Sequence, residues 1–468
     1  MQVLGTAGET AGGRDKKLKV LVCTRFTYFY MPPTKCLLII LDGLGDRQYS
    51  ELGGQTPLQA AHTPNLDRLA HLGGNGLYHA GRLGEPFPSE NAHFALFGYP
   101  QVLFPGRGPL EALGAGIELA EGEVAVLAHF VSAENRNGML FVCRDSPEEV
   151  EQREAQAVFD QSAWFEHLGV EISLHRTKGL FGVLVLRGEA SPRITDSNPM
   201  RDMAQATDVV AWTEAGFSVR AEATAKALRT YLGRIFHHLD RCDVNISRRQ
   251  RGLSPINALV TQRAGRMRAV PSFTSRTGLK GASIASGALF QGLAKFIGLD
   301  RHDVPEKKDV EGDFTARLDL AARILPKYDF IHVHTKAPDE AAHRKDCRAK
   351  REVIEALDRS LTPYMPILAQ DPELLTVIAS DHSTPSSGPM IHSGEPVPVI
   401  MRAESIRRDQ VQAFDEISAA CGSLGLMRDT ELFQMVLNGL NKAKLQGIRE
   451  VAEERIFWPG PAPGLSLE

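Results

Sequence analysis

The chain has 468 residues, of which 43% are hydrophobic and 24% are charged, and its formal net charge is −4. This length exceeds one ordinary hydrophobic core, so we expect at least two domains in a globular protein. The small negative charge, without a long basic run, argues against a nucleic-acid partner. No stretch approaches about 18 consecutive apolar residues, so we expect no membrane span. The six cysteines are scattered without a Cys-x-x-Cys pair, which favours reduced thiols and a cytoplasmic location. Nothing in these values indicates an oligomeric state.

The first 30 residues differ from those that follow. Positions 1–18 are rich in Gly, Thr and charged residues, and no clear apolar region or cleavage site of a signal peptide is present. We therefore predict that the folded domain starts near Met31 and that residues 1–30 are an N-terminal extension or the result of a misassigned start.

The segment up to about residue 120 predicts a strand followed by helices. An apolar strand is expected over 36–41, and a helix begins at Pro64, capped by Thr63, and ends before Gly73-Gly74. A second helix is predicted from Ser89. The Gly-rich segment 106–119 then predicts a tightly packed loop with a short helix.

The pattern changes after about residue 120. Strand candidates accompany two helix candidates, over 148–165 and 221–239, and none of these elements carries residues that favour a metal. We predict that this segment is an inserted, smaller α/β domain of ordinary size. The predicted division is residues 31–120 and 270–455 for the main domain, 121–269 for the insertion, and 456–468 for an irregular tail.

Strands and helices alternate after residue 270, which predicts a mostly parallel sheet flanked by helices. A strand followed by a helix is expected over 281–299. The later elements are a helix over 313–325, a strand over 328–335, a helix over 346–368, strands over 374–380 and 396–402, and a helix over 428–443. The fold class is therefore predicted to be α/β.

Residues that favour divalent metals lie in four short segments, and three of these segments directly follow a predicted strand. They are Asp42, Ser89, Asp339, His343, Asp381, His382 and His392. Ligands of open α/β sheets bind beyond the carboxyl ends of the strands, so three such ends predict one shared site. Three carboxylates and three imidazoles exceed what one ion usually takes, which indicates two metals. This pattern alone does not choose among phosphatases, nucleases and peptidases.

The individual signals have alternative explanations. Asp339 and His343 are four residues apart, so on a helical turn they can reach one ion, but a surface ion pair has the same spacing. Asp381 and His382 follow a buried strand, where a charged pair needs partners that a metal would supply. The alternative is that Asp381 caps a helix and His382 lies at the edge of the core. His392 alone is a weak signal.

Ser89 opens a helix in the segment Pro-Ser-Glu-Asn, which is an ordinary N-cap pattern. The same geometry suits catalysis, because free N–H groups at a helix N-terminus attract phosphate. A serine oxygen beside a divalent ion is held closer to an alkoxide and can act as a nucleophile without a dedicated base. His93 shares the helix face of Ser89, and we expect it to pack or hydrogen-bond. With Ser89 included, the pattern favours phosphoryl transfer through a covalent serine.

Several motifs together resemble one enzyme family. They are LLIILDGLGDR (37–47), TPLQAAHTPNLDRLA (56–70), SENAHFALFGYP (89–100), GRGPLEALGAGIEL (106–119), VHTKAPDEAAH (333–343), SDHSTP (380–385) and HSGEPVPV (392–399). In combination, across most of residues 35–442, they resemble the cofactor-independent (2,3-bisphosphoglycerate-independent) phosphoglycerate mutases of the archaeal type, within the alkaline phosphatase superfamily. The resemblance implies an alkaline-phosphatase-like, mostly parallel sheet with an inserted domain.

The resemblance also implies roles for the seven residues. One metal would be bound by Asp42, Ser89, Asp381 and His382. The second metal would be bound by Asp339, His343 and His392. Ser89 would become phosphoserine. The family generally uses manganese, and magnesium, cobalt or zinc also serve its members. The implied reaction interconverts 2- and 3-phosphoglycerate in glycolysis and gluconeogenesis, with a small phosphorylated substrate, while the inserted domain closes over the site and excludes water.

The substrate carboxylate and phosphate need basic groups, because arginine binds both in a forked geometry. The segment RITDSNP resembles the family's Asp-Pro motif and suggests Asp196 and Arg193 as substrate contacts. Arg263 and Lys280 are further candidates.

Two departures from the family pattern fall on the substrate side. Met200 stands where the family usually has histidine, and EKKDVEGDF (306–314) replaces a Gly-rich, Thr-containing stretch. The change around Met200 favours an alternative function, a metal-dependent phosphomonoesterase or phosphonate-active hydrolase on the same core. A catalytically silent regulatory or binding protein is a third class, and the retention of all seven site residues argues against it.

Overall fold

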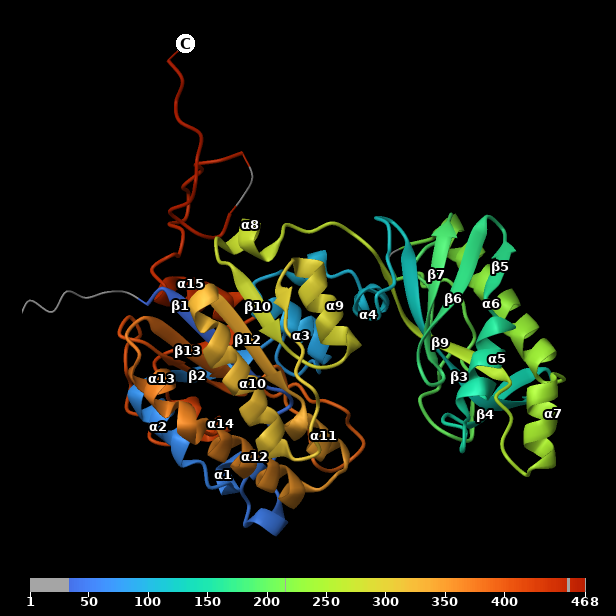
Figure 1. Ribbon diagram of the computed structural model, residues 1–468, viewed down its shortest axis with the longest axis horizontal. Coiled ribbons are helices and arrows are strands. Elements are labelled where there is room, and N and C mark those ends of the chain that lie inside the picture. The colour runs from blue at the N-terminus through green and yellow to red at the C-terminus, as the bar shows by residue number, and fades with distance from the viewer. Residues whose placement is uncertain (1–32, 215, 453–454, 468) are drawn as a thin grey trace, which may run out of the picture. The chain divides into compact units, whose positions relative to one another are not determined.

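Two β-sheets organise the part of the chain that this computed structural model describes, residues 33–214, 216–452 and 455–467 (Figure 1). The predicted extension over residues 1–30 and the start near Met31 lie outside the described residues. The two sheets are built from different segments and differ in strand direction.

The first sheet has eight strands and is mostly parallel. Their spatial order is β11 (Asp300–Arg301), β10 (Gly281–Ile284), β12 (Phe330–Thr335), β1 (Lys35–Leu41), β13 (Leu374–Ala379), β14 (Val397–Arg402), β2 (Gly74–His79) and β15 (Gly425–Arg428). Strand β14 runs antiparallel to both of its neighbours, and the other pairs are parallel. The predicted α/β class with a mostly parallel sheet is thus confirmed.

Helices cover both faces of this sheet (Figure 1). Alternate residues of β1 enter different cores: Leu38 and Ile40 join one, and Leu37 and Ile39 join the other. Burial on both faces explains the unbroken apolar run of β1. The first core contains residues of α3 (Ser89–Leu96), α9 (Ala288–Ile297) and α15 (Glu431–Gly439), and the second contains residues of α2 (Pro64–Leu72), α10 (Val310–Ile324), α12 (Cys347–Leu361) and α13 (Met365–Gln370).

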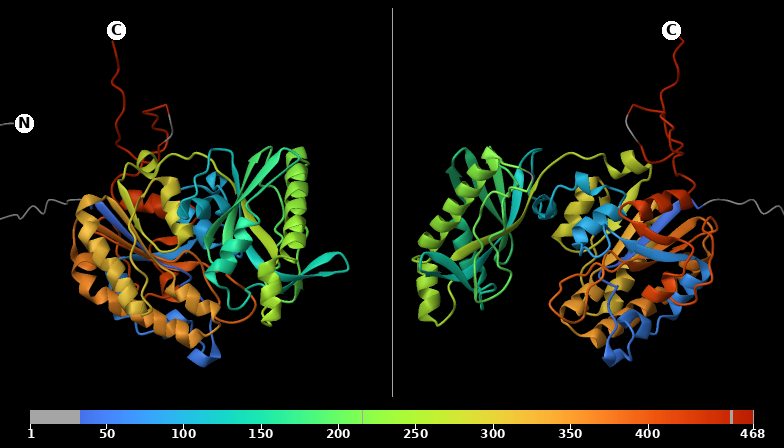
Figure 2. Two further views of the ribbon diagram at one scale, coloured as in Figure 1. Left: turned by 45° about the vertical axis from the view of Figure 1, so that its right-hand side comes forward. Right: turned by 180° about the vertical axis from the view of Figure 1, so that it is seen from behind.

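The second sheet is antiparallel throughout. It comprises β5 (Trp164–His167), β6 (Val170–Lys178), β7 (Phe181–Gly188), β3 (Val124–Arg136), β4 (Met139–Arg144) and β8 (Ala204–Gln205), with β9 (Ala258–Arg266) paired to β3. Helices α5 (Gln152–Asp160), α6 (Val219–Leu239) and α7 (Asp243–Gln250) belong to the same segment (Figure 2). All of these elements fall within residues 121–269, which we keep as the proposed limits of the inserted domain.

Two predicted helices differ from those in the structure. The helix expected over 148–165 ends at Asp160, and Trp164–His167 forms β5, because its residues pair with β6. The helix expected over 346–368 is divided into α12, a 3-10 turn and α13. Pro363 and Pro366 lie at this division, where each removes a backbone N–H donor.

Short helices complete the description: α1 (Pro57–Ala60), α4 (Arg107–Gly114), α8 (Phe273–Thr277), α11 (Ala337–His343) and α14 (Glu416–Ala419). In the described segments, no helix has the length and apolar character to cross a membrane. The five cysteines in these segments are free thiols.

Candidate functional site

Three neighbouring strands present their carboxyl ends to one region. Strand β1 lies between β12 and β13 and is parallel to both. Asp42 follows β1 directly, and the segment Ser380–His382 follows β13. Strand β12 leads into α11, which carries Asp339 and His343 on successive turns. Adjacent parallel strands end at the same sheet edge, so these side chains lie close together, as the sequence predicted.

Ser89 is the first residue of α3 and does not cap it. The N-cap position belongs to Pro88, and no side chain caps this helix. Ser89 Oγ instead lies 2.9 Å from Nε2 of His382, and both residues are buried. The ordinary N-cap explanation of this serine is therefore wrong, because its hydroxyl faces the strand ends.

The first group of candidate ligands surrounds this contact. Nε2 of His382 lies 3.4 Å from Oδ1 of Asp42 and 3.2 Å from Oδ2 of Asp381. The ligand atoms of these three residues all lie within 4.8 Å of one another. Together with Ser89 Oγ, which lies 2.9 Å from Nε2 of His382, this buried group offers three oxygens and one nitrogen.

Asp339 is the centre of the second group. Its Oδ1 lies 3.2 Å from Nε2 of His343 and 3.7 Å from Nε2 of His392. His392 donates a hydrogen bond from Nδ1 to the carbonyl oxygen of Phe87, at 2.8 Å. That bond leaves Nε2 as the acceptor nitrogen, which is the form that binds metals.

The two groups adjoin each other. The rings of His382 and His392 are stacked with centroids 3.7 Å apart. Thr384 links the groups through its hydroxyl, which donates to Oδ1 of Asp339 at 2.9 Å and lies 3.0 Å from Nδ1 of His382. Thr384 was not among the predicted site residues, although it lies two residues after His382.

Unpaired oxygens show that the first group fits a cation. Among the described residues, Oδ1 of Asp42 and Oδ2 of Asp381 are buried without a hydrogen-bond partner. The second oxygen of each carboxylate is bonded: Asp42 Oδ2 to Nε2 of His334, and Asp381 Oδ1 to the N–H groups of Gly43 and His382. Buried, unpaired carboxylate oxygens are costly, and a divalent ion would satisfy both at once.

The pKa shifts of Asp381 and His382 agree with a cation-binding site. Burial raises the pKa of Asp381 well above its usual value, and the nearby charge of Asp42 raises it further. Burial lowers the pKa of His382 to about 3, so the imidazole is neutral near pH 7, as a metal ligand must be.

Three buried histidines lie behind the first group. His334 donates to Asp42 at 2.9 Å, and His93 donates from Nδ1 to the carbonyl oxygen of Ser89 at 2.9 Å. His332 lies two residues before His334 on β12 and bonds to Ser283 instead. The packing and hydrogen-bonding role expected for His93 agrees with its position. His334 was missed, although its place next to the end of β12 could have suggested it.

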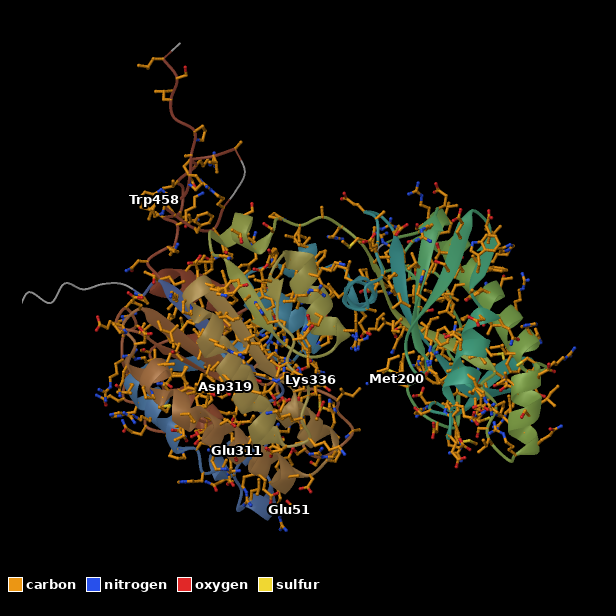
Figure 3. All side chains as sticks on the ribbon, in the orientation of Figure 1. Glu51, Met200, Glu311, Asp319, Lys336 and Trp458 are labelled. Carbon is orange, nitrogen blue, oxygen red and sulfur yellow. The ribbon has the colours of Figure 1, made fainter. Side chains whose placement is uncertain are left out.

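A cavity of about 630 Å³ opens beside both groups. Ser89, Asp339, His343 and His392 contribute to its wall. Three cationic side chains also line it, and they are Arg107, Arg263 and Lys336. Burial alone would lower the pKa of Lys336, but the neighbouring carboxylates, Asp42 first, raise it above its usual value. Lys336 is therefore positively charged in the wall of the cavity. Its side chain is labelled in Figure 3.

Glu90 lies within ion-pair distance of two of these cationic side chains, Arg107 and Arg263. It is 2% exposed, and its Oε1 lies 3.7 Å from Nη1 of Arg107 and 3.6 Å from Nη1 of Arg263. Glu90 and Arg107 were not among the predicted site residues, even though both stand within motifs that carry the family resemblance.

The four predicted substrate contacts are not all brought together. Arg263 lines the cavity, and its backbone N–H donates to Oδ1 of Asp196 at 2.8 Å. Asp196 and Arg193 are exposed and are not part of the cavity wall. Lys280 precedes β10 at its amino end, opposite the site, and its Nζ lies over the ring of Tyr328. Met200 does line the cavity.

Comparison with known proteins first defines the class. The model of the Metalloenzyme superfamily matches residues 34–439. The chain is thus a member of that superfamily, which agrees with the two groups of candidate ligands.

Curated relatives then define the family. The chain is 37% identical over 410 residues to the 2,3-bisphosphoglycerate-independent phosphoglycerate mutase of Methanopyrus kandleri, covering 86% of this chain and 95% of the relative. It is 36% identical over 434 residues to 2,3-bisphosphoglycerate-independent phosphoglycerate mutase 2 of Methanocaldococcus jannaschii, covering 91% and 97%. The chain belongs to the family of 2,3-bisphosphoglycerate-independent phosphoglycerate mutases.

Solved structures agree with this assignment. The cofactor-independent phosphoglycerate mutase from Thermoplasma acidophilum aligns with a TM-score of 0.60 and 30% identity, over 87% of this chain and 99% of that chain. A protein from Pyrococcus horikoshii aligns with a TM-score of 0.72 and 29% identity, over 89% and 100%.

Proposed function

We propose that the protein interconverts 2-phosphoglycerate and 3-phosphoglycerate through a phosphoserine at Ser89. The observation that carries this proposal is the position of Ser89 Oγ, 2.9 Å from Nε2 of His382 and beside the unpaired oxygens of Asp42 and Asp381. Nucleophilic serines need a neighbour that stabilises the ionised oxygen. The names of the relatives supply the substrate pair.

Two divalent ions complete the proposed site. Asp42, Asp381 and His382 would hold one ion together with Ser89, and the second group would hold the other, through Asp339, His343 and His392. The ions would offset the negative charge of the phosphoryl oxygens and favour the ionised form of the serine hydroxyl. Oxygen and imidazole donors without a thiolate are compatible with Mn²⁺, the ion that we propose, and magnesium, cobalt or zinc are the alternatives.

The side chains of this chain have distinct tasks in the reaction. Ser89 accepts the phosphoryl group from one hydroxyl of the substrate and returns it to the other. Arg107, Arg263 and Lys336 provide positive charge for the phosphate and carboxylate while glycerate reorients. Glu90 positions the two arginines, which limits the loss of side-chain entropy when substrate binds.

A phosphohydrolase is the second candidate function. Met200 lines the cavity where the resembled family usually has histidine, and it is 58% exposed. A thioether is only a weak hydrogen-bond acceptor and cannot transfer a proton. The site would then hold glycerate less well, and water would take the phosphoryl group in its place.

One experiment separates these two functions. The full chain is incubated with 3-phosphoglycerate and Mn²⁺, and phosphorus NMR follows all phosphorus species. Formation of 2-phosphoglycerate without free phosphate supports the mutase. Release of phosphate without the second isomer identifies the hydrolase and overturns the proposal.

A further inference from the structure

A second cavity, of about 400 Å³, lies at the carboxyl ends of β10 and β12. Its wall includes Ser286 and Gly287, which follow β10, and Lys336, which follows β12. Lys336 also lines the first cavity, so this one side chain borders both spaces. Because ligands of α/β sheets bind beyond the carboxyl ends of strands, this position is favourable for a second ligand.

Arg317 in the wall of this cavity has an unsatisfied donor. The residue is 3% exposed and lies on α10. Its Nε donates to Asp313 at 2.8 Å and its Nη2 donates to Ser286 Oγ at 2.5 Å. Its Nη1 is buried without a partner among the described residues. A guanidinium that is bonded through two of its nitrogens, with the third left without a partner, is prepared to bind an anion.

The charge of the wall agrees with an anionic ligand. Five cationic side chains line the cavity: Lys307, Lys308, Arg317, Lys336 and Arg344. Three acidic side chains also line it: Glu306, Asp313 and Glu340. One acid, Asp313, is already paired with Arg317. Lys308 is exposed and makes no hydrogen bond or ion pair with the rest of the described chain. The excess positive charge suits a ligand with two negative charges.

The N-terminus of α9 adds backbone donors. Gly287 is its N-cap residue, and no side chain caps the helix. A side chain added at Gly287 would meet nothing within 4 Å, so this helix end is open to the cavity that Gly287 lines. Uncapped helix N-termini favour phosphate and carboxylate groups.

We propose that this cavity binds a small phosphate-bearing anion through Arg317, Lys308 and the N-terminus of α9. Inorganic phosphate and phosphate monoesters share the required chemistry. Residues 306–314, which replace a Gly-rich stretch of the resembled family, supply Lys307 and Lys308. The site is therefore a feature of this chain's own sequence.

Binding here affects the first cavity through Lys336. An anion in the second cavity attracts the ammonium group that the substrate also needs, so it raises the KM for substrate. This consequence rests on the proposed function, whereas anion binding itself does not.

The binding test uses the full chain after treatment with a chelator, so that no divalent ion recruits phosphate to the first cavity. Inorganic phosphate is titrated at low salt by calorimetry into the wild type, Lys308→Glu and Lys226→Glu. The last variant makes the same charge change on exposed Lys226 of α6. We expect one site, weakened about tenfold or more by Lys308→Glu and unchanged by Lys226→Glu. Absence of binding, or equal affinities in all three proteins, overturns the proposal.

Two further measurements complete the test. Titration with glycerol 3-phosphate in place of inorganic phosphate shows which of the two anions the cavity prefers. Glycerol 3-phosphate that binds more tightly than phosphate, and is weakened by Lys308→Glu, indicates a phosphate monoester as the ligand. Glycerol 3-phosphate that binds more weakly than phosphate indicates free phosphate. In the mutase assay, Lys308→Glu should leave uninhibited turnover unchanged and reduce inhibition by the better ligand. Unchanged inhibition contradicts the coupling through Lys336. A protein that binds phosphate at this cavity but lacks mutase activity would overturn the proposed function and not the anion site.

Discussion

Ser89 Oγ lies 2.9 Å from Nε2 of His382, although 293 residues separate them in the chain. The first residue of α3 thereby meets the segment that follows β13. The contact places a hydroxyl beside the carboxylates of Asp42 and Asp381 and next to a helix N-terminus. A nucleophile, candidate metal ligands and phosphate-binding N–H groups thus meet in one place.

Removing this hydroxyl should abolish turnover. Ser89→Ala leaves no oxygen to accept the phosphoryl group, so we expect kcat to fall by about 10³-fold or more in the mutase assay. Ser383→Ala is the matched control, because Ser383 is also buried and its Oγ has no hydrogen-bond partner among the described residues. Comparable activity in Ser89→Ala and the wild type would exclude Ser89 as the nucleophile.

His334 should determine how tightly the first ion binds. It donates to Oδ2 of Asp42 and thereby turns Oδ1 toward the candidate site. His334→Phe keeps the aromatic contact with Phe290 but loses this bond, and we expect Mn²⁺ affinity to fall by about 10- to 100-fold.

His332→Phe is the control for that experiment. His332 is on the same strand and is equally buried, but it bonds to Ser283 and not to a candidate ligand. Mn²⁺ titration of the metal-depleted proteins should show a much smaller effect for this variant. Equal losses in both variants would indicate damage to packing and not a role in orienting Asp42.

Asp42, Asp381 and Ser89 were predictable because they follow a strand or open a helix, and such positions can be identified in the sequence. His343, at the end of α11, and His392, in a loop, stand at neither kind of position. Asp42 and Asp381 directly follow apolar runs, and the sheet order brings those runs side by side. The partners of these ligands were not predictable in the same way. His334 stands next to the end of its strand, which could have placed it near the site, but nothing in the sequence distinguishes packing from a bond to Asp42.

Lys280 shows another limit of sequence analysis. Its motif lies close to a strand, but the motif does not say at which end of the strand the lysine stands. The structure places Lys280 before β10, at the end away from Asp42. The helix predicted over 346–368 is divided because Pro363 and Pro366 interrupt its backbone hydrogen bonds, and both prolines are visible in the sequence.

Lys350 should be important for stability. It is fully buried, and its Nζ donates to the carbonyl oxygens of Gly45 and Thr384 and to Oδ2 of Asp46, all within 3.0 Å. It therefore joins the two segments that carry Asp42 and Asp381. Lys350→Met leaves these acceptors without their donor, and we expect a loss of about 3–5 kcal/mol in the free energy of unfolding.

Urea denaturation measures this loss. The double variant Lys350→Met/Asp46→Asn should recover part of it, because the buried charge is then removed with its partner. Exposed Lys226, changed to methionine, should alter stability by less than about 0.5 kcal/mol. A Lys350→Met protein as stable as the wild type would show that the buried pair contributes nothing.

Glu416 should make stability depend on pH. Burial raises its pKa to about 7 from the usual 4.5, in spite of hydrogen bonds from Asp46 N and Thr56. The folded state therefore binds this proton more tightly than the unfolded state. Stability is lost as pH rises from 4.5 to about 7 and changes no further above that range.

The variant Glu416→Gln cannot ionise, so it should lose less stability over that window. We expect the difference in unfolding free energy between about pH 5 and about pH 8 to shrink by up to about 3 kcal/mol. Urea denaturation at both values tests this. The same pH dependence in the variant and the wild type would show that Glu416 is ionised throughout.

A covalent phosphoryl group on Ser89 is the most direct test of the account. The wild type is mixed with Mn²⁺ and 3-phosphoglycerate, quenched in acid during turnover, and digested for mass spectrometry. We expect one phosphoryl group on the peptide that contains Ser89, and none on that peptide from Ser89→Ala. Rapid interconversion of the two isomers with an unmodified Ser89 at every quench time would contradict the account.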